Sequence, residues 1–482
     1  MQTAKIIRQG AVIKVVPPYA NLLAPYLTYS RRVQTGGNAK DADYVTTRLY
    51  EVAAGAGIET GLLTSFGLLK HVCGALNHLG IETKYEDWSG INKATAVPDF
   101  SKLPDLRDLQ PEVLASIVAN EWGIIAAPTG FGKTFLIKQL TSIWPQARFI
   151  ICCPYTDVIV NLYRNLKLEY RDGEVGMVGA GYKEADCRIT CCVDKSLGRC
   201  DLGHCDCFIF DEAHRAASPG NAATIARLTH ARRYAFSASW KGRSDGADLE
   251  TIALLGDLIC RLSYKEVEKV GAVVPVEVRI ISTAKCLPVP PNANSVVLNR
   301  RGIWRNESRN KLLATAVSRI IKELGEETQV LVTVATIDHA VNLQRFLPDF
   351  KIVYGSMDAD DRVRWERLGW LKTGEHPISQ ETRSRMHADF AAGSLKRVIA
   401  TGVWGTGANF PKLTVLVRAD SQSGSIPSTQ LPGRVTRTCE GKDRGIVLDC
   451  DDLMNPTLAR RAERRFAVYR SKGWEIARVS CD

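Results

Sequence analysis

The stretch Ala127-Pro128-Thr129-Gly130-Phe131-Gly132-Lys133-Thr134 has the composition of a phosphate-binding loop. Apolar residues before it predict a buried strand, and the residues after it predict a helix start. Glycines let such a turn point several N–H groups at one anion, and the helix N-terminus adds partial positive charge. Lys133 would reach the β- and γ-phosphates of a nucleotide, and the Thr134 hydroxyl would ligate Mg²⁺. We therefore expect a nucleotide site that uses Thr129, Gly130, Phe131, Gly132, Lys133 and Thr134.

A second chemical motif, Asp211-Glu212-Ala213-His214, ends the apolar run Phe208-Ile209-Phe210. A carboxylate at the carboxyl end of a sheet strand, close to a phosphate loop, is suited to hold Mg²⁺, which is the role expected for Asp211. Glu212 would orient and activate the attacking water. His214 would sense the γ-phosphate and couple it to a nucleic-acid site.

These motifs resemble those of the superfamily 2 helicases and translocases, and the resemblance covers residues 106 to about 455. It implies ATP as the nucleotide. Leu106 to Gln110 is similar to their adenine-reading motif, and the Gln110 amide offers the acceptor and donors that adenine needs. Ser237-Ala238-Ser239 resembles their coupling motif. Gln430 to Arg437 resembles their sixth motif, which implies an arginine finger at Arg437 with Arg434 beside it.

Further segments resemble the family motifs that contact the nucleic-acid backbone. They are Pro154-Tyr155-Thr156, Asp194 to Leu197, Val332 to Ala340 and Thr401 to Asn409, the last with Asn409 where Asp is more usual. The resemblance thus implies nucleic-acid contacts at Pro154, Thr156, Lys195, Ser196, Thr336 and Thr401, and a nucleotide contact at Gly407.

Within the superfamily, the sequence looks most like the phage recombination helicases of the UvsW-like kind. The segment from Ser239 to Gly246, the region from Gly61 to Leu79 and the run from Arg460 to Trp474 carry this looser likeness. It implies ATP-driven remodelling of branched DNA, such as forks, recombination intermediates and R-loops.

The elements that must position these motifs form three regions. Residues 1–105 predict a small α+β accessory domain, with a β-hairpin from Ile6 to Val16, a helix from Gly67 to Leu79 capped by Ser65 or Thr64, and a strand from Ile81 to Tyr85. We expect this domain to bind DNA, and the alternative is that it only braces the motor. From Leu106, apolar strands alternate with helices, which predicts a parallel-sheet α/β domain over 106–271 and a second over 272–482. The resemblance implies that both are RecA-like, with a cleft whose closure brings the arginines to the nucleotide.

Composition indicates the class of protein, the kind of partner and the expected location. The chain has 482 residues, 45% apolar and 24% charged, as is ordinary for a globular protein. Its net charge of +11 weakly favours a polyanionic partner. We see no apolar run of membrane-spanning length and no signal-peptide pattern, and we expect a cytoplasmic location, the host cytoplasm if the chain is phage-encoded.

Two residue clusters allow alternative interpretations. Cysteines and one histidine crowd between Cys187 and Cys207, but they lack paired C-x₂-C spacing, so buried thiols are favoured over zinc. The basic run from Arg460 to Arg470 is interpreted as a solvated helix face, with phosphate contact as the alternative. Core packing is likewise favoured over base stacking for Trp240 and Trp404.

Several functions fit the motor motifs. The first is a DNA helicase or branch-migration translocase acting on branched DNA, or on duplex with single-stranded regions. A motor subunit of a restriction or defence complex is the second, and a DEAH-type RNA helicase is the third, because such motifs grip backbone rather than bases. A non-catalytic ATP-gated clamp is disfavoured, since Glu212 is present rather than Gln.

Overall fold

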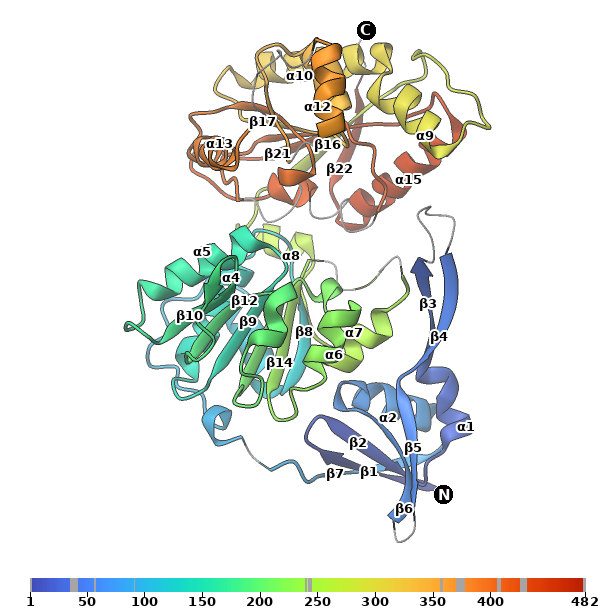
Figure 1. Cartoon of the computed structure of the whole chain (residues 1–482), viewed down its shortest axis with the longest axis vertical. Helices are drawn as coiled ribbons and strands as arrows, with labels where there is room; N and C mark the ends of the chain where they lie inside the picture. Colours follow the sequence, from blue (N-terminus) through green and yellow to red (C-terminus); the bar gives the residue numbers. More distant parts are fainter. Residues whose placement is uncertain are drawn as a thin grey trace. The chain divides into compact units, whose positions relative to one another are not determined.

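The computed structural model describes residues 2–34, 42–55, 58–90, 92–238, 241, 245–355, 359–369, 378–404, 409–424 and 431–479. It contains two large, mainly parallel sheets and a smaller N-terminal sheet, which confirms the predicted α/β class (Figure 1). The chain divides into two compact units, Met1–Pro128 with Gly132–Leu262, and Thr129–Phe131 with Ser263–Asp482. The domain boundaries near residues 105 and 271 stay a prediction.

The first large sheet has eight strands in the order β11-β10-β12-β9-β13-β14-β8-β15. Each strand pairing described in it is parallel, except that of β10 with β11. The carboxyl ends of its parallel strands therefore meet at one edge. The strands are β8 Trp122–Ala126, β9 Phe149–Cys153, β10 Val175–Gly179, β11 Tyr182–Lys183, β12 Ile189–Val193, β13 Cys207–Asp211, β14 Arg232–Ser237 and β15 Leu258–Arg261.

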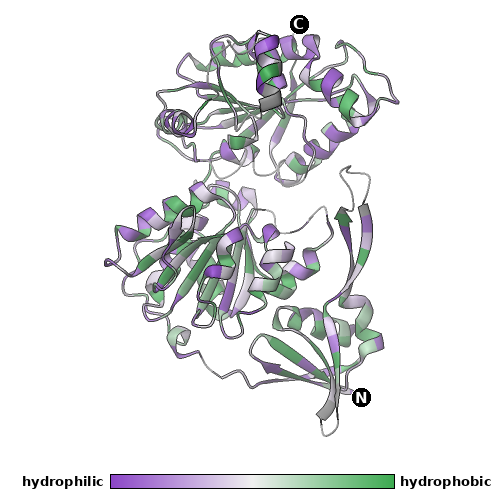
Figure 2. Cartoon of the chain, viewed as in Figure 1, coloured by the Kyte–Doolittle hydropathy of each residue, from purple (hydrophilic) through white to green (hydrophobic). Residues whose placement is uncertain are grey.

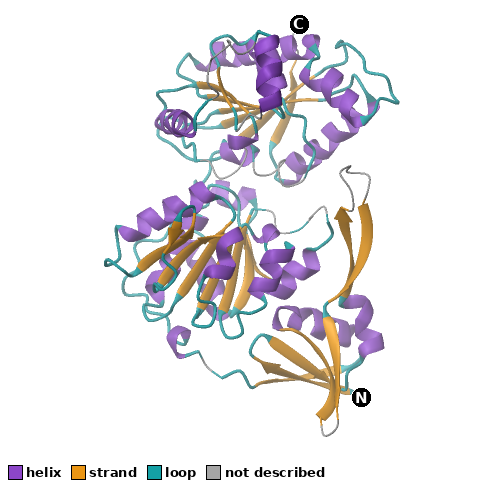
Figure 3. Ribbon diagram, in the orientation of Figure 1, coloured by secondary structure: helices purple, strands orange, loops and turns teal. Residues whose placement is uncertain are grey.

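Helices lie on both faces of this sheet (Figure 3). Strands covered on both faces are continuous apolar runs, and the strands of this sheet are largely hydrophobic in Figure 2. Every residue of β8, β9 and β13 is buried. This is why the sequence predicted these strands. The helical elements of this unit from Gln110 onward are α3 Gln110–Ala119, α4 Lys133–Ile143, α5 Thr156–Lys167, η4 Asp194–Arg199, η5 Ala213–Arg215, α6 Pro219–Ile225 and α7 Asp248–Leu255.

The N-terminal sheet has five strands in the order β5-β6-β2-β1-β7. The predicted hairpin is confirmed as the antiparallel pair β1 and β2. The predicted helix is split into η2 and α2, and the Ser65 side chain accepts a hydrogen bond from the Gly67 N–H at its start. The elements are β1 Thr3–Gln9, β2 Val12–Val16, α1 Ala20–Leu23, η1 Ala24–Tyr26, β5 Tyr50–Gly55, β6 Ile58–Ser65, η2 Phe66–Leu68, α2 Leu69–His78, β7 Glu82–Asp87 and η3 Lys93–Thr95.

A separate two-stranded ribbon, which the sequence did not predict, rises from the N-terminal region. It is formed by β3 Thr28–Gln34 and β4 Ala42–Arg48, paired antiparallel from Thr28 with Arg48 to Gln34 with Ala42. The N-terminal sheet packs on the first large domain, because its apolar core includes Ile252 and Ala253 of α7.

The second large sheet has seven strands in the order β18-β19-β17-β20-β21-β16-β22, and every described pairing is parallel. The strands are β16 Val276–Ile281, β17 Val330–Thr333, β18 Lys351–Val353, β19 Arg397–Ala400, β20 Val415–Arg418, β21 Gly445–Cys450 and β22 Glu475–Val479. The helical elements are α8 Tyr264–Lys269, α9 Ser295–Val297, η6 Leu298–Trp304, α10 Glu307–Leu324, α11 Ile337–Gln344, α12 Ala359–Arg367, α13 Gln380–Ala392, η7 Gly402–Trp404, η8 Pro432–Arg434 and α15 Pro456–Ser471.

The structure tests the expectations for Trp404 and for the basic run on α15. Trp404 is buried against Phe390 and Phe410, which confirms core packing, whereas Trp240 lies outside the described residues. The solvated face predicted for the basic run is wrong at Arg465, which is fully buried on α15.

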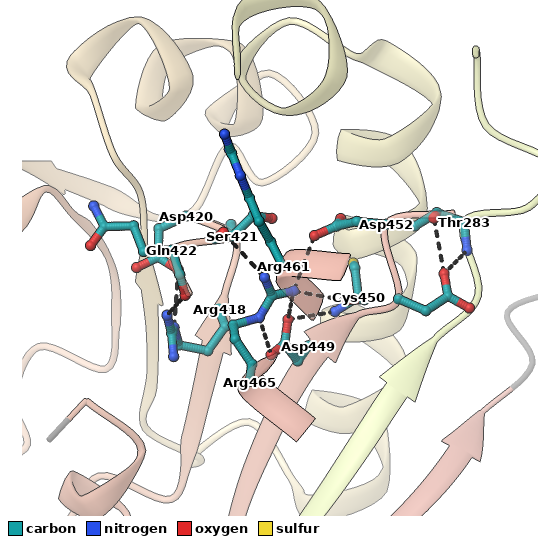
Figure 4. A network of polar contacts seen from close by, with 12 residues as sticks. Thr283, Arg418, Asp420, Ser421, Gln422, Asp449, Cys450, Asp452, Arg461 and Arg465 are labelled. Carbon is teal, nitrogen blue, oxygen red and sulfur yellow. Dashed lines mark hydrogen bonds and ion pairs between the residues drawn. The ribbon is translucent and has the colours of Figure 1, made fainter. Parts of the chain in front are cut away.

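Arg465 is buried because two carboxylates compensate its charge. Its guanidinium donates to both carboxylate oxygens of Asp449 at 2.8 Å and to Asp452 at 3.0 Å (Figure 4). Arg309, also buried, pairs with the other oxygen of Asp452 at 3.0 Å. The network joins β21 to α15 and α10.

The described part of the chain contains no helix long and apolar enough to cross a membrane.

Candidate nucleotide site

The phosphate loop connects β8 to α4, in the strand–turn–helix context that the sequence predicted. Gly130 and Gly132 have φ values of 93° and 99°, in the left-handed region that favours glycine. Gly132 also has a steric reason to be glycine, since a Cβ there would lie 2.9 Å from Gln110 Nε2. Lys133 opens α4, and its ammonium donates to the carbonyls of Ala127 and Pro128 at 3.1 and 3.2 Å.

Gln110 is held beside this loop at the first residue of α3. Its side chain is buried, and its Oε1 accepts a hydrogen bond from the Arg107 N–H at 3.0 Å. The same amide therefore touches the backbone before α3 and lies against Gly132. The structure thus brings Gln110 together with the phosphate loop, as the resemblance implied, while its contact with adenine stays a prediction.

The acidic motif lies at the carboxyl end of β13. Asp211 is buried and ends the strand, and Glu212 follows with a φ of 69°. The Glu212 N–H donates to the Phe236 carbonyl at 2.7 Å and contacts Asp211 Oδ1 at 3.1 Å. The Glu212 N–H thus ties this backbone turn to β14.

Ser237, at the end of β14, joins the acidic motif to the phosphate loop. Its hydroxyl lies 3.5 Å from both Glu212 Oε2 and His214 Nδ1, and the last two atoms are 3.4 Å apart. Its carbonyl accepts a hydrogen bond from the Ala127 N–H at 3.1 Å. Because β14 lies between β13 and β8, one residue contacts both halves of the site.

The electrostatics of the site follow from burial. Burial raises the pKa of Asp211, and the Lys133 charge acts in the opposite direction. A cation near Asp211 therefore favours the ionised carboxylate. The oxygen donors of Asp211 and Thr134 suit Mg²⁺, which is often held by one or two protein oxygens and the phosphates of its ligand. Among the residues described, no three His, Cys, Asp or Glu side chains form a group that could hold a metal ion.

The sixth-motif arginines lie in the second unit. Arg434 ends η8 and is buried, and Arg437 forms an antiparallel β-bridge with Val273. Burial lowers the pKa of Arg437 to about 10, which still leaves the guanidinium charged at neutral pH. Gly407 lies outside the described residues.

The expected nucleic-acid contacts lie at the carboxyl edges of the two large sheets. Pro154 and Thr156 follow β9, and Lys195 and Ser196 lie in η4 directly after the neighbouring strand β12. In the second unit, Thr401 follows β19, and Thr336 caps α11 by accepting a hydrogen bond from the His339 N–H at 3.2 Å. Nothing in the structure tests their contact with nucleic acid.

The cysteine cluster is largely core, because Cys191, Cys192, Cys205 and Cys207 are buried. Burial raises the pKa of the Cys191, Cys205 and Cys207 thiols. The pKa of Cys192 is raised first by a hydrogen bond with Cys152 and then by burial. Absence of zinc stays a prediction.

The fold and this site define an ATP-binding protein of the phosphate-loop class with a second α/β domain. Residues 103–241 match the family described as "Type III restriction enzyme, res subunit", and residues 313–439 match "Helicase conserved C-terminal domain". With both matches in this order, the chain is an ATP hydrolase of the superfamily 2 helicases.

Known proteins resemble the chain at several levels. The DNA 3'-5' translocase XPB2 of Sulfurisphaera tokodaii is 28% identical over 368 residues, which are 71% of this chain and 80% of the relative. An HsdR subunit fragment of a type I restriction enzyme from Vibrio vulnificus has a TM-score of 0.57 at 14% identity, covering 94% of this chain and 92% of its own. One structure of T4 UvsW has a TM-score of 0.43 at 13% identity, with full coverage of both chains.

Proposed function

We propose that this chain is an ATP-driven DNA translocase that remodels branched DNA. The observation that carries the proposal is the position of Ser237, which contacts Glu212 and His214 through its hydroxyl and the phosphate loop through its carbonyl. A change of charge at the γ-phosphate would alter these contacts at the strand edge, where the expected nucleic-acid residues also lie. Hydrolysis and grip on nucleic acid can be coupled through such a shared residue.

In this proposal, each residue of the nucleotide site has a definite role. Lys133 would stabilise the β- and γ-phosphates, Asp211 and Thr134 would hold Mg²⁺, and Glu212 would position and deprotonate the attacking water. Gln110 reads adenine, and His214 reports the γ-phosphate through Ser237. Arg437 stabilises the charge that develops during hydrolysis, with Arg434 in support.

The choice of DNA rests on sequence likeness. The relative at 28% identity is named as a DNA translocase. The choice of branched DNA rests on the UvsW-like segments and on the additional N-terminal sheet and ribbon, which offer a contact point outside the motor.

A motor subunit of a restriction or defence complex is the second candidate. The match of residues 103–241 to a restriction-subunit family favours it. Such a subunit would act together with partner subunits, whereas a remodelling translocase would unwind DNA as the purified chain alone.

The test is the ATPase rate of the purified chain with single-stranded, duplex, forked and four-way-junction DNA and with RNA, together with unwinding of the branched substrates. Glu212→Gln serves as the matched control. The variant keeps Asp211 and should still bind Mg²⁺–ATP, but its amide cannot act as a base. We expect stimulation by branched DNA above the others and slow turnover in the variant. Preference for RNA, absence of unwinding by the chain alone, or parental turnover in Glu212→Gln would contradict the proposal.

A further inference from the structure

The β3–β4 ribbon has two faces with different surroundings. Residues directly opposite each other in an antiparallel pair point to the same face, and successive residues alternate. The register pairs Tyr29 with Thr47 and Arg31 with Val45, which defines an inner face. Ser30 pairs with Thr46 and Arg32 with Tyr44, which defines an outer face.

The inner face is fastened to the first large domain. Arg31 donates to Glu250 at 3.0 Å and to the Ala217 carbonyl at 2.9 Å, and it contacts Asp245 at 3.4 Å. The Tyr29 hydroxyl donates to the same Glu250 carboxylate at 2.5 Å. The Arg31 and Glu250 side chains are each only 16% exposed, so the pair is well shielded from solvent.

The backbone of the ribbon is fastened as well. The Arg32 N–H donates to the Asp245 carbonyl at 3.0 Å, which pairs the edge of β3 at this residue. A Cβ at Gly246 would lie 2.9 Å from the Ser30 carbonyl, which shows how closely the two segments approach. These contacts attach the ribbon to the domain along β3, while Val45 on the inner face of β4 stays 50% exposed.

The outer face is basic, aromatic and rich in hydroxyl groups. Tyr44 is 73% exposed, and the side chains around it are exposed too. Among the described residues of this face with described side chains, none is acidic and none is aliphatic; they are Thr28, Ser30, Arg32, Tyr44, Thr46 and Arg48.

This composition selects one class of partner. A protein interface needs an apolar centre that is desolvated on binding, and this face has none. Arginines and hydroxyl groups spaced along a strand suit a phosphate backbone, and an exposed tyrosine ring offers a stacking platform for an unpaired base.

The anchor points connect the ribbon to the ATP site. Ala217 lies shortly after the motif Asp211 to His214, and Asp245 to Glu250 follow Ser237 in the chain. Thus Arg31 contacts the two segments that follow the Asp211–His214 motif and Ser237 in the chain.

We propose that the outer face of the β3–β4 ribbon is a DNA-binding surface, on which Arg32 and Arg48 bind phosphates and Tyr44 stacks on an unpaired base at a branch. This inference deepens the proposed function by assigning the branch contact to particular side chains outside the motor motifs. It rests on the proposed function for the choice of DNA.

The test is equilibrium binding of the full chain to a fluorescent DNA fork without nucleotide, followed by anisotropy over a range of salt concentrations. Arg32→Glu/Arg48→Glu is compared with Lys70→Glu/Lys84→Glu, which makes the same charge change at exposed positions on α2 and β7. Tyr44→Ala is compared with Tyr44→Phe, which keeps the ring. Circular dichroism melting verifies that each variant is folded.

We expect the arginine variant to weaken fork binding about tenfold or more. The slope of log K against log[salt] should fall by the amount expected for the loss of about two phosphate contacts. Tyr44→Ala should weaken binding by about fivefold or more, and Tyr44→Phe should bind like the parent. Unchanged binding in the ribbon variants, an equal loss in the lysine control, or tighter ribbon-dependent binding of an RNA fork would overturn the inference.

The binding assay separates this inference from the proposed function. A chain that binds forks through the ribbon but shows no DNA-stimulated ATPase would contradict the translocase and keep the ribbon. A DNA-stimulated ATPase whose fork binding is unchanged by the ribbon substitutions would keep the translocase and contradict the ribbon as the DNA-binding surface.

Discussion

The Ser237 hydroxyl lies 3.5 Å from the Glu212 carboxylate, at the ends of two adjacent parallel strands. The distance is long for a hydrogen bond, so the contact can tighten or break with little cost. The two residues belong to separate motifs that the sequence placed far apart in the chain. Parallel pairing of β13 with β14 brings them together, and it gives the acidic motif a partner that also contacts the phosphate loop.

Ser237→Ala removes this hydroxyl from a fully buried position. We expect basal ATP hydrolysis to persist, because Glu212 and Asp211 remain, while stimulation by DNA and unwinding fall strongly. Ser237→Thr keeps the hydroxyl and should preserve the coupling. Rates of phosphate release with and without forked DNA check this prediction, and equal stimulation of parent and alanine variant would contradict it.

Lys133→Ala should abolish ATP hydrolysis, because the variant lacks the cation nearest the β- and γ-phosphates. The same lysine charge opposes the burial that raises the pKa of Asp211. Mg²⁺ needs the ionised carboxylate, and the raised pKa lets protons compete for it, so the Mg²⁺ concentration that gives half-maximal activity of the parent should rise as the pH falls. Phosphate release across a pH series measures both effects. Normal turnover of the variant would refute the assignment.

Arg437→Ala should lower kcat roughly 10³-fold or more while ATP binding changes little, because a finger acts on transition-state charge. Burial lowers the Arg437 pKa only to about 10, so its charge is present at neutral pH. Arg437→Lys should not restore the rate, since an ammonium lacks the planar fork of donors. Arg434→Ala should also impair turnover. Near-normal kcat in both alanine variants would remove the finger from the mechanism.

The sequence predicted the buried parallel strands because their two covered faces demand uninterrupted apolar runs, as in Phe149–Cys153. It missed β10, whose two glycines weaken the strand pattern, and the four-residue β15. The β3–β4 ribbon was missed because polar and charged residues occupy most of it, and its position depends on Glu250, which is distant in sequence.

The nucleotide motifs were readable because their chemistry follows from residue type and local spacing. Contacts between residues that are distant in the sequence could not be predicted from local patterns. Ser237 lies beside Glu212 because β13 and β14 are neighbours in the sheet, and no local pattern in the sequence gives that strand order. Burial of Arg465 depends on Asp449 and Asp452, whose approach no local pattern on α15 indicates.

Arg465→Ala should destabilise the second unit by about 3–5 kcal/mol, because Asp449 and Asp452 then stay buried with less compensation. Arg470→Ala, on the same helix with an exposed partner in Glu463, should cost at most about 1 kcal/mol. Chemical denaturation of both variants measures the difference, and similar stabilities would contradict the role of the network.

The network also predicts a pH dependence. Burial alone would raise the pKa of Asp452, but the charges of Arg309 and Arg465 outweigh it and hold this pKa below its usual value. A depressed carboxylate pKa stabilises the fold above the unfolded-state pKa, and this stabilisation is lost as the pH falls through the folded-state value. The parent should therefore lose stability in acid by a margin that Arg465→Ala lacks.

The N-terminal region is held to the motor at Gly67. A Cβ at this residue would lie 2.3 Å from the Ile252 carbonyl oxygen and 2.6 Å from that of Ala253, both backbone atoms of α7. Removing residues 1–105 altogether would expose Ile252 and Ala253, which complete the N-terminal core. A single methyl group is therefore a cleaner means of disturbing this contact than truncation.

Gly67→Ala should loosen the N-terminal sheet from α7, because neither carbonyl can move without distorting that helix. We expect faster proteolysis within residues 1–105 and loss of the preference for forks over plain duplex, while ATP hydrolysis stays dependent on nucleic acid. Gly74→Ala is the matched control, since a Cβ there meets nothing within 4 Å and alanine favours the interior of α2. Limited proteolysis and ATPase rates with fork and duplex measure both variants. A Gly67→Ala chain that keeps its fork preference would show that branch recognition does not depend on this docking.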